Sequence, residues 1–299
     1  MRFRALLLAF VLAPLAAYAA KSDAVSPQQP APLTSADERA ALHNGPDWAL
    51  IAPHLPDPKT ATASELEMAG DVLRARRFPE DALDYYGYAM QRGGEVSELL
   101  NKMGIVRLEL RQIDLAHAMF LRTVRAHKKN PVGWNNLGVT DYSMQDYRGA
   151  VDAYRHAVKL NKNSAVFHSN LGLAYFEESD LEGARHEFAR ALQLDPSIMS
   201  GSDNGGTTAH VLGSHNYSGM CLEMAKLFAR EHDVDRMLYW LAKASDAGLD
   251  LRTAIHEDSA LTTYAKDPRV TLLVENERQL HARSVATAKP PSLGTSASH

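Results

Sequence analysis

The chain has 299 residues, of which 45% are hydrophobic and 23% are charged, an ordinary balance for a globular protein with a sizeable core. Its 32 basic and 36 acidic side chains leave a formal net charge of −4, so the overall charge does not indicate a nucleic-acid partner. Cys221 is the single cysteine, which excludes an internal disulfide. These bounds favour one or two folded domains.

Residues 1–19 are typical of a secretory signal peptide. Arg2 and Arg4 precede an apolar run from Ala5 to Ala13, and Ala17 to Ala19 supply a small-x-small cleavage site. The apolar run is shorter than the roughly 20 residues that span a bilayer, which favours a cleaved signal over an anchor. We therefore predict an exported protein, periplasmic or secreted and bacterial, with no integral membrane span in the mature chain.

Residues 20–62 form a leader rich in Pro and Ala. Ser35 and Glu38 have the spacing of a capping box, which predicts a short helix from Ser35 to about Leu42. Asn44-Gly45-Pro46 ends this helix, and we expect the prolines that follow to keep the chain extended or turning up to residue 62.

The same residue types then recur every 34 residues, which divides the chain into units 63–96, 97–130, 131–164 and 165–198. Two antiparallel helices approach closely only where side chains are small, and an aromatic ring fills the space that remains. Each unit is accordingly predicted to hold one helix near positions 1–14 and a second near positions 17–30. The recurring residues are glycine at position 8 (Gly70, Gly104, Gly138, Gly172), alanine at position 20 (Ala82, Ala116, Ala150, Ala184) and an aromatic ring at position 24 (Tyr86, Phe120, Tyr154, Phe188).

This pattern resembles the tetratricopeptide repeat (TPR), a helix–turn–helix unit of the same period. The resemblance implies an all-α fold, a TPR α-solenoid in which antiparallel helix pairs stack into a right-handed superhelix. Position 11 departs from the pattern, because Arg107 and Asp141 replace a large apolar residue. We predict that these two charges pair between neighbouring units, and that Leu108 and Tyr142 take over the packing.

After residue 198 the period breaks. Residues 199–217 are rich in Gly and Ser and are predicted to form a loop. Residues 218–251 are interpreted as a degenerate TPR-like unit, and 252–283 as a helical cap of two shorter helices broken at Asp267-Pro268. A solenoid needs such a cap, because its last unit would otherwise expose an apolar face. Residues 284–299 are predicted to be disordered.

Motifs for catalysis are lacking in the sequence. It contains neither a Gly-rich phosphate loop nor Gly-x-Ser-x-Gly, so we predict no enzymatic activity and no cofactor. His210 and His215 are weak candidate metal ligands, and they leave open an alternative ligand-binding, metal-binding or enzymatic role centred on the 200–218 loop. His186-Glu187 is interpreted as a solvated pair, and Cys221 as a small buried core residue.

The resemblance implies that positions 5 and 6 of the first helices face a concave groove. Asn is a poor residue for a helix interior, so its repetition there suggests a purpose, and its amide can both donate to and accept from a peptide backbone. We predict a scaffold that binds an extended peptide or partner protein, with a self-associating structural protein as a further alternative. The family's carboxylate clamp needs Lys and then Asn in its first unit, where this chain has Glu67 and Asp71, so that mode is not supported. The predicted groove residues are Asn101, Lys102, Asn135, Asn136, Tyr142 and Asn170.

Overall fold

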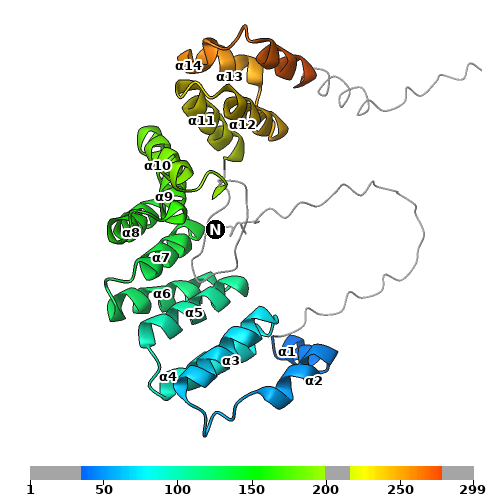
Figure 1. Cartoon of the computed structure of the whole chain (residues 1–299), viewed down its shortest axis with the longest axis vertical. Coiled ribbons are helices and arrows are strands. Elements are labelled where there is room, and N and C mark those ends of the chain that lie inside the picture. Colours follow the sequence, from blue (N-terminus) through cyan, green and yellow to red (C-terminus); the bar gives the residue numbers. More distant parts are fainter. Residues whose placement is uncertain (1–34, 199–215, 278–299) are drawn as a thin grey trace, which may run out of the picture.

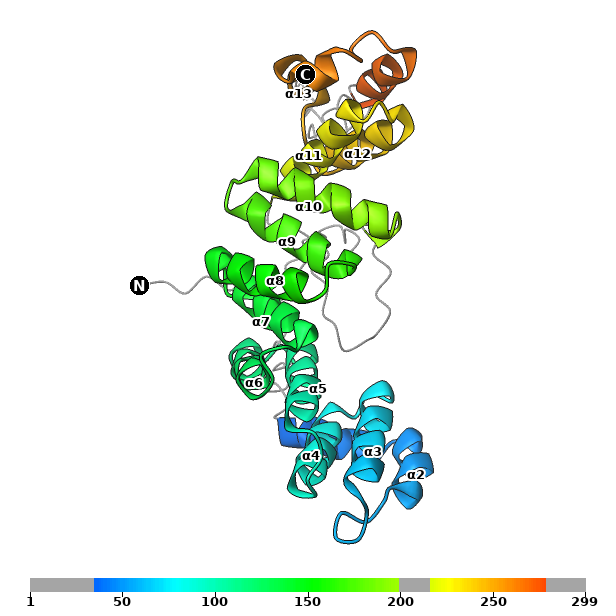
Figure 2. The same cartoon turned by 60° about the vertical axis from the view of Figure 1, so that its left-hand side comes forward.

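The computed structural model describes residues 35–198 and 216–277, and every regular element within these residues is helical. The helices are arranged as successive pairs along an arc, with the leader at one end and the last helices at the other (Figure 1). Turned by 60°, the same pairs lie one above the next (Figure 2). The predicted all-α solenoid is confirmed.

The leader contains two helices and a 3₁₀ turn, namely α1 (Ser35–His43), α2 (Pro46–Ile51) and η1 (Ala52–His54). The sequence predicted only the first of these. The extended or turning chain expected up to residue 62 is wrong for residues 46–54, which are helical, and right for residues 55–62. Pro46 is the first residue of α2, where a missing N–H costs nothing, so this proline begins a helix directly after the previous one ends.

The leader helices cover the outer end of the first repeat pair. The Trp48 ring packs against Phe78 with 5.2 Å between ring centroids, and His43 stacks on Trp48. Arg39 Nη2 and His43 Nε2 lie 2.5 and 3.0 Å from the carboxylate of Asp81, which is buried. The leader therefore shields the apolar end of the array, a role that the sequence did not suggest.

Four helix pairs follow without an inserted residue. Their second helices begin at residues suited to a helix start: Pro79 opens α4, and the side chains of Asp146 and Asp180 accept from backbone N–H groups of α8 and α10. The pairs are α3 (Ala63–Ala75) with α4 (Pro79–Gln91), α5 (Val96–Glu109) with α6 (Ile113–Ala126), α7 (Pro131–Ser143) with α8 (Tyr147–Leu160), and α9 (Ala165–Glu177) with α10 (Leu181–Leu194).

Each position-8 glycine faces the position-24 ring of its own unit. A Cβ on Gly138 would lie 2.7 Å from the Tyr154 ring, and one on Gly172 would lie 2.7 Å from the Phe188 ring, both closer than real contacts allow. Gly70 and Gly104 meet Tyr86 and Phe120 in the same way. The predicted packing of a small residue against a large ring is thus confirmed, and it is the contact that joins the two helices of a pair.

A left-handed residue at position 15 closes the turn inside every pair. Its backbone φ lies between 58° and 66° although none of the residues is glycine, which is why no sequence signal marked it. The next N–H then donates to the carbonyl five residues earlier, as Asp146 N does to Asp141 O at 2.9 Å. The residues concerned are Arg77, Arg111, Gln145, Ser179 and, in the α11–α12 pair, His232.

The charges at position 11 do not pair with each other, and that prediction is wrong. Asp141 Oδ1 lies 3.0 Å from Nε2 of His117, on the second helix of the preceding unit, while Arg107 donates to Gln112 within its own unit. Tyr142 is buried in the main core, and Leu108 packs against it, as expected.

The C-terminal part begins with α11 (Tyr217–Arg230) and α12 (Val234–Asp246), whose turn has the geometry of the regular repeats. Cys221 is fully buried there, as predicted. The cap is more broken than expected: α13 (Leu251–Glu257) and α14 (Ser259–Thr262) are separated by Asp258, whose carboxylate caps α14, before a helix at 268–277. The predicted signal, the tail and nearly all of the loop lie outside the described residues.

Candidate partner-binding face

The first helix of each pair lies toward the inside of the arc. Figure 1 shows this most clearly for α3, inside α4, and for α7, inside α8. Residues at equal repeat positions of these inner helices follow one another along the arc. The inner face is therefore the surface on which the predicted groove residues can be compared.

A first polar stripe joins position 6 of one inner helix to position 5 of the helix before it. Asn136 Nδ2 donates to Asn101 Oδ1 at 2.9 Å, and Asn170 Nδ2 donates to Asn135 Oδ1 at 2.8 Å. Within α7, Asn135 Nδ2 lies 3.1 Å from Asn136 Oδ1. These contacts link α5, α7 and α9 into one chain of amides, which we call the asparagine ladder.

The same register continues toward α3 with charged residues. Lys102 Nζ lies 2.5 Å from Glu67 Oε1 and 2.8 Å from Asp71 Oδ2. Burial acts to lower the pKa of Lys102, but its hydrogen bonds to Asp71 and Glu67 outweigh burial and raise the pKa above the ordinary value. The Tyr86 hydroxyl donates to Asp71 at 2.8 Å. Lys102 is thus held as a cation between two carboxylates.

A second polar stripe joins position 12 to position 13 of the next inner helix. Arg74 Nη2 lies 2.7 Å from Glu109 Oε1, between α3 and α5. Two units further along, the Tyr142 hydroxyl donates to Glu177 Oε1 at 2.9 Å, between α7 and α9. This second stripe therefore joins α3 to α5 and α7 to α9, alongside the first stripe.

All six predicted groove residues lie in these stripes, and all six are buried. Asn135, Asn136 and Asn170 have exposed fractions of 0%, Asn101 has 5% and Lys102 has 8%. Tyr142 belongs to the second stripe rather than the ladder. The sequence reasoning missed Glu67, Asp71 and Glu177 as partners of these residues. The signal that could have found several of them is the 35-residue spacing that relates Glu67 to Lys102 and Tyr142 to Glu177.

The α3 end of the inner face differs from the rest. Met68 stands at position 6, where the following units have Lys102, Asn136 and Asn170, and its side chain is 65% exposed. Val72, one turn further along α3, is 44% exposed. The ladder thus continues at this end into an accessible apolar surface.

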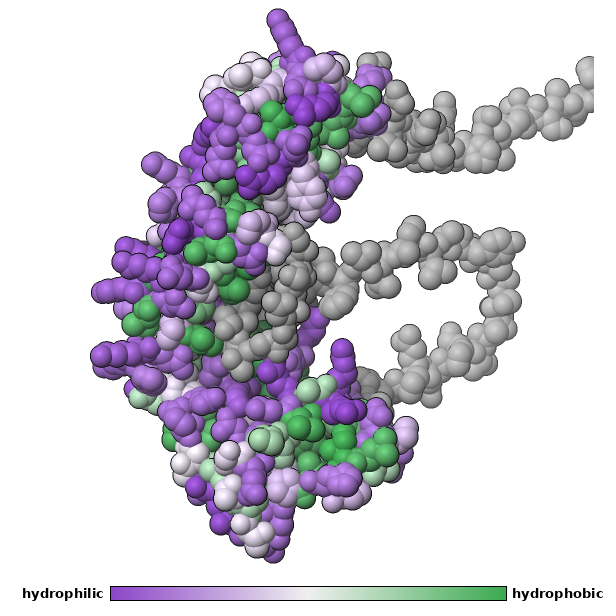
Figure 3. All heavy atoms as spheres, in the orientation of Figure 1, coloured by the Kyte–Doolittle hydropathy of each residue, from purple (hydrophilic) through white to green (hydrophobic). Residues whose placement is uncertain are grey.

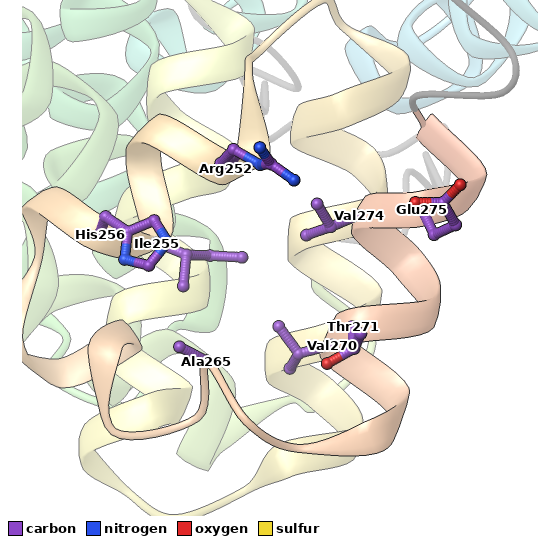
Figure 4. A pocket seen from close by; sticks show the side chains of 8 residues that line it. All are labelled: Arg252, Ile255, His256, Ala265, Val270, Thr271, Val274 and Glu275. Atoms are coloured by element: carbon purple, nitrogen blue, oxygen red, sulfur yellow. The ribbon is translucent and has the colours of Figure 1, made fainter.

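A cleft of about 180 Å³ lies in the cap, between α13 and the helix at 268–277. Ile255 and Val270 are buried at its floor, while Arg252, His256 and Glu275 stand at its edges (Figure 4).

Within residues 35–198 and 216–277, no group of three or more His, Cys, Asp or Glu side chains is placed to hold a metal ion. His210 and His215 fall outside these ranges. Glu187, predicted to be solvated, instead pairs with the buried His168 at 2.5 Å.

Two family models match the middle of the chain. A TPR repeat model matches residues 138–179, and a tetratricopeptide repeat model matches residues 165–198. The chain is a tetratricopeptide-repeat protein. The matched residues cover part of α7 and all of α8, α9 and α10, and they include Asn170 of the ladder. The matched TPR units therefore carry part of the candidate face.

Solved structures share the fold of this TPR protein. PilF of Pseudomonas aeruginosa is 16% identical, with a TM-score of 0.50 over 76% of this chain and 93% of PilF. YrrB, described as a TPR protein with an unusual peptide-binding site, is 20% identical, with a TM-score of 0.44 over 65% of this chain and 91% of YrrB. MamA from Desulfovibrio magneticus RS-1 is 18% identical, with a TM-score of 0.46 over 64% of this chain and 96% of MamA. No curated protein sequence matches the TPR protein.

No helix among its described residues has the length and apolar content needed to cross a membrane.

Proposed function

We propose that this TPR protein is a non-enzymatic scaffold that binds an extended segment of a partner protein along the inner face of the arc. The observation that carries the proposal is the pair of polar stripes on α3, α5, α7 and α9. Asn costs stability inside a helix, and an all-apolar contact between neighbouring helices would avoid that cost. A polar inner face is better explained by a ligand that itself presents polar groups.

An extended peptide is such a ligand. Its backbone presents an N–H and a C=O group at each residue, and an Asn amide of the ladder can match either kind of group once the contact that buries it opens. Recognition through the backbone tolerates many partner sequences, which suits a scaffold. The exposed Met68 and Val72 at the α3 end would then receive an apolar side chain of the same segment.

An internal segment of the partner fits this face better than a chain terminus. Lys102 is the cation in the ladder register, and Glu67 and Asp71 already neutralise it. A terminal carboxylate would therefore have to compete with two carboxylates for one ammonium group. The segment bound here is expected to lack a terminal or clustered negative charge at the α3 end.

The proposal includes export to the cell envelope, which the signal-like residues 1–19 support. Expression of the full chain, followed by cell fractionation and N-terminal sequencing of the product, tests this part. A protein that stays in the cytoplasm with Met1 or Arg2 at its N-terminus would contradict it.

Site-directed photo-crosslinking tests the binding face. A photoreactive residue replaces Met68 or Val72 on the inner side, and a matched one replaces Asp152, an exposed residue of the outer helix α8. We expect the inner positions to give one crosslinked partner, with the crosslinks confined to one short segment of it. Equal crosslinking at Asp152 would show that the inner face is not the binding surface.

A second experiment asks whether the ladder contacts the ligand. The double variant Asn136→Ala with Asn170→Ala is expected to weaken capture of the crosslinked partner at protein concentrations where circular dichroism shows it folded. Unchanged capture by the folded variant would leave the ladder with a packing role only.

A further inference from the structure

Two long stretches of the chain contain no acidic residue. Residues 115–140 include four Lys or Arg and no Asp or Glu, and residues 153–176 include three Lys or Arg and no Asp or Glu. The whole chain nevertheless has a net charge of −4. Positive charge is therefore concentrated in units two and three, although the overall composition conceals it.

Repeat geometry brings most of these cations together. Arg125 and Lys159 stand at position 29 of α6 and α8, and Lys128 and Lys162 stand at position 32, in the turns after those helices. Equal positions of stacked units lie side by side. Arg122 lies one turn before Arg125 on α6, and Lys129 follows Lys128. We call these six residues the basic rim: Arg122, Arg125, Lys128, Lys129, Lys159 and Lys162.

The basic rim is exposed and lacks anionic partners. All six side chains are exposed, and among the described residues none of them forms an ion pair. In Figure 3 long hydrophilic side chains project from the outer, left-hand edge of the arc at the level of α6 and α8. Basic residues in the last turn of a helix stabilise its dipole, which accounts for Arg125 and Lys159. It does not account for Lys128, Lys129 and Lys162, because both helices have ended before them.

The turns that carry these lysines are held by a repeated contact. Trp134 Nε1 donates to the carbonyl of Lys128 at 2.9 Å, and His168 Nε2 donates to the carbonyl of Lys162 at 3.0 Å. Both donors stand at position 4 of the unit that follows the turn. The lysines are thus presented on fixed backbone, so less conformational entropy is lost when they meet a ligand.

We propose that the basic rim is a docking surface for anionic phospholipid headgroups at a membrane surface. Leu160 lies between Lys159 and Lys162, and its side chain is 41% exposed. A bilayer interface takes up cationic and apolar side chains together, whereas a nucleic acid or an acidic peptide leaves such a leucine without a partner. The rim belongs to α6, α8 and the turns after them, whereas the ladder lies on α5, α7 and α9, so docking leaves the inner face accessible. The inference does not depend on the proposed scaffold function.

Vesicle co-sedimentation of the full chain tests the proposal. The vesicles contain one part phosphatidylglycerol to two parts phosphatidylcholine, with phosphatidylcholine alone as the uncharged comparison. We expect binding to the anionic vesicles only, and its loss at high salt. Removing three charges with Lys128→Gln, Lys129→Gln and Lys162→Gln is expected to lower the partition coefficient about a hundredfold, since one basic residue contributes about fivefold at an anionic surface.

The matched control removes three exposed cations outside the rim, with Arg76→Gln, Arg230→Gln and Lys266→Gln. It should bind nearly as well as the wild type, and circular dichroism should show both variants folded. An equal loss in the control would mean that only net charge matters and would overturn the proposal. So would absence of binding to the anionic vesicles. A single-stranded oligonucleotide that the wild type binds and the rim variant does not, without vesicle binding, would assign the rim to nucleic acid.

Discussion

Asn136 Nδ2 donates to Asn101 Oδ1 at 2.9 Å, from a position one repeat and one residue further along the chain. The same 35-residue step relates Asn170 to Asn135 and Lys102 to Glu67. One register therefore joins the inner helices of four units, although the residues in it change from charged to amide. The candidate ligand surface is also a joint between repeats.

The ladder should contribute to the stability of the array. In a double-mutant cycle of Asn101→Ala and Asn136→Ala, we expect a coupling of about 0.5–1.5 kcal/mol in the free energy of unfolding, because each single change removes one shared hydrogen bond. Denaturant unfolding measures it. A cycle of Asn136→Ala with Asn276→Ala, an exposed residue of the 268–277 helix, should show no coupling. Equal coupling in both cycles would contradict an ordered ladder.

Tyr154 and Tyr86 occupy the same repeat position but differ in their hydroxyl partners. The Tyr154 hydroxyl is buried without a hydrogen bond, whereas that of Tyr86 donates to Asp71. We expect Tyr154→Phe to leave the free energy of unfolding unchanged or raise it by about 1 kcal/mol, and Tyr86→Phe to lower it by about 1 kcal/mol. Phe120 and Phe188 show that a phenylalanine fits this position. Thermal unfolding distinguishes the two variants, and a larger loss for Tyr154→Phe would contradict the assignment.

The contact between Gly138 and the Tyr154 ring predicts a strong effect of one methyl group. Gly138→Ala forces the ring to move and should lower the free energy of unfolding by about 1–3 kcal/mol. Gly87, in the middle of α4, has nothing within 4 Å of an added Cβ. Gly87→Ala should therefore raise stability by about 0.5–1 kcal/mol through helix propensity. If chemical denaturation shows that both variants raise, or both lower, the free energy of unfolding, the tight packing of Gly138 against Tyr154 would be contradicted.

Asp141 should make stability depend on pH. Burial raises the pKa of its carboxyl to about 6, and the nearby His117 only partly opposes this effect. The folded state then binds more protons than the unfolded state between about pH 4 and pH 6, so the wild type loses stability as the pH rises through this window. Asp141→Asn removes that loss. Above pH 6 its free energy of unfolding should exceed that of the wild type by about 1–3 kcal/mol, reduced by the stability that the contact with His117 contributes.

The difference in unfolding free energy between Asp141→Asn and the wild type, measured from pH 4 to pH 8, tests this expectation. It should grow with pH and then level off. Asp152→Asn, which changes an exposed residue of α8, should give no comparable step. A difference that shrinks as the pH rises would reverse the sign of the argument.

Much of the fold could be predicted because its causes lie within one repeat. Gly138 and Tyr154 are 16 residues apart, and their sizes alone require the two helices between them to meet there. Pro79 marks a helix start through its fixed backbone, and Asp146 does so through the side-chain carboxylate that accepts from Gly149 N. The left-handed turn was not predictable in this way, since Arg77 and His232 bear no resemblance to the glycine that usually marks it.

Contacts between units were harder to predict. His117 meets Asp141 of the next unit because of the angle at which helices pack, and sequence periodicity does not contain that angle. The same reason applies to His168 and Glu187, which meet across the helix pair of the fourth unit. The residues predicted to line a groove were chosen from their repeat positions, and their burial and mutual hydrogen bonds were not expected.

The 34-residue period was therefore enough to establish the helix pairs and their packing residues, because close packing of two neighbouring helices is a local steric condition. The tertiary structure decided which charges pair, which hydroxyl lacks a partner, and that lysines distant in sequence form one rim. Each of these depends on distances between helices, within a pair or between pairs, and helix packing sets those distances.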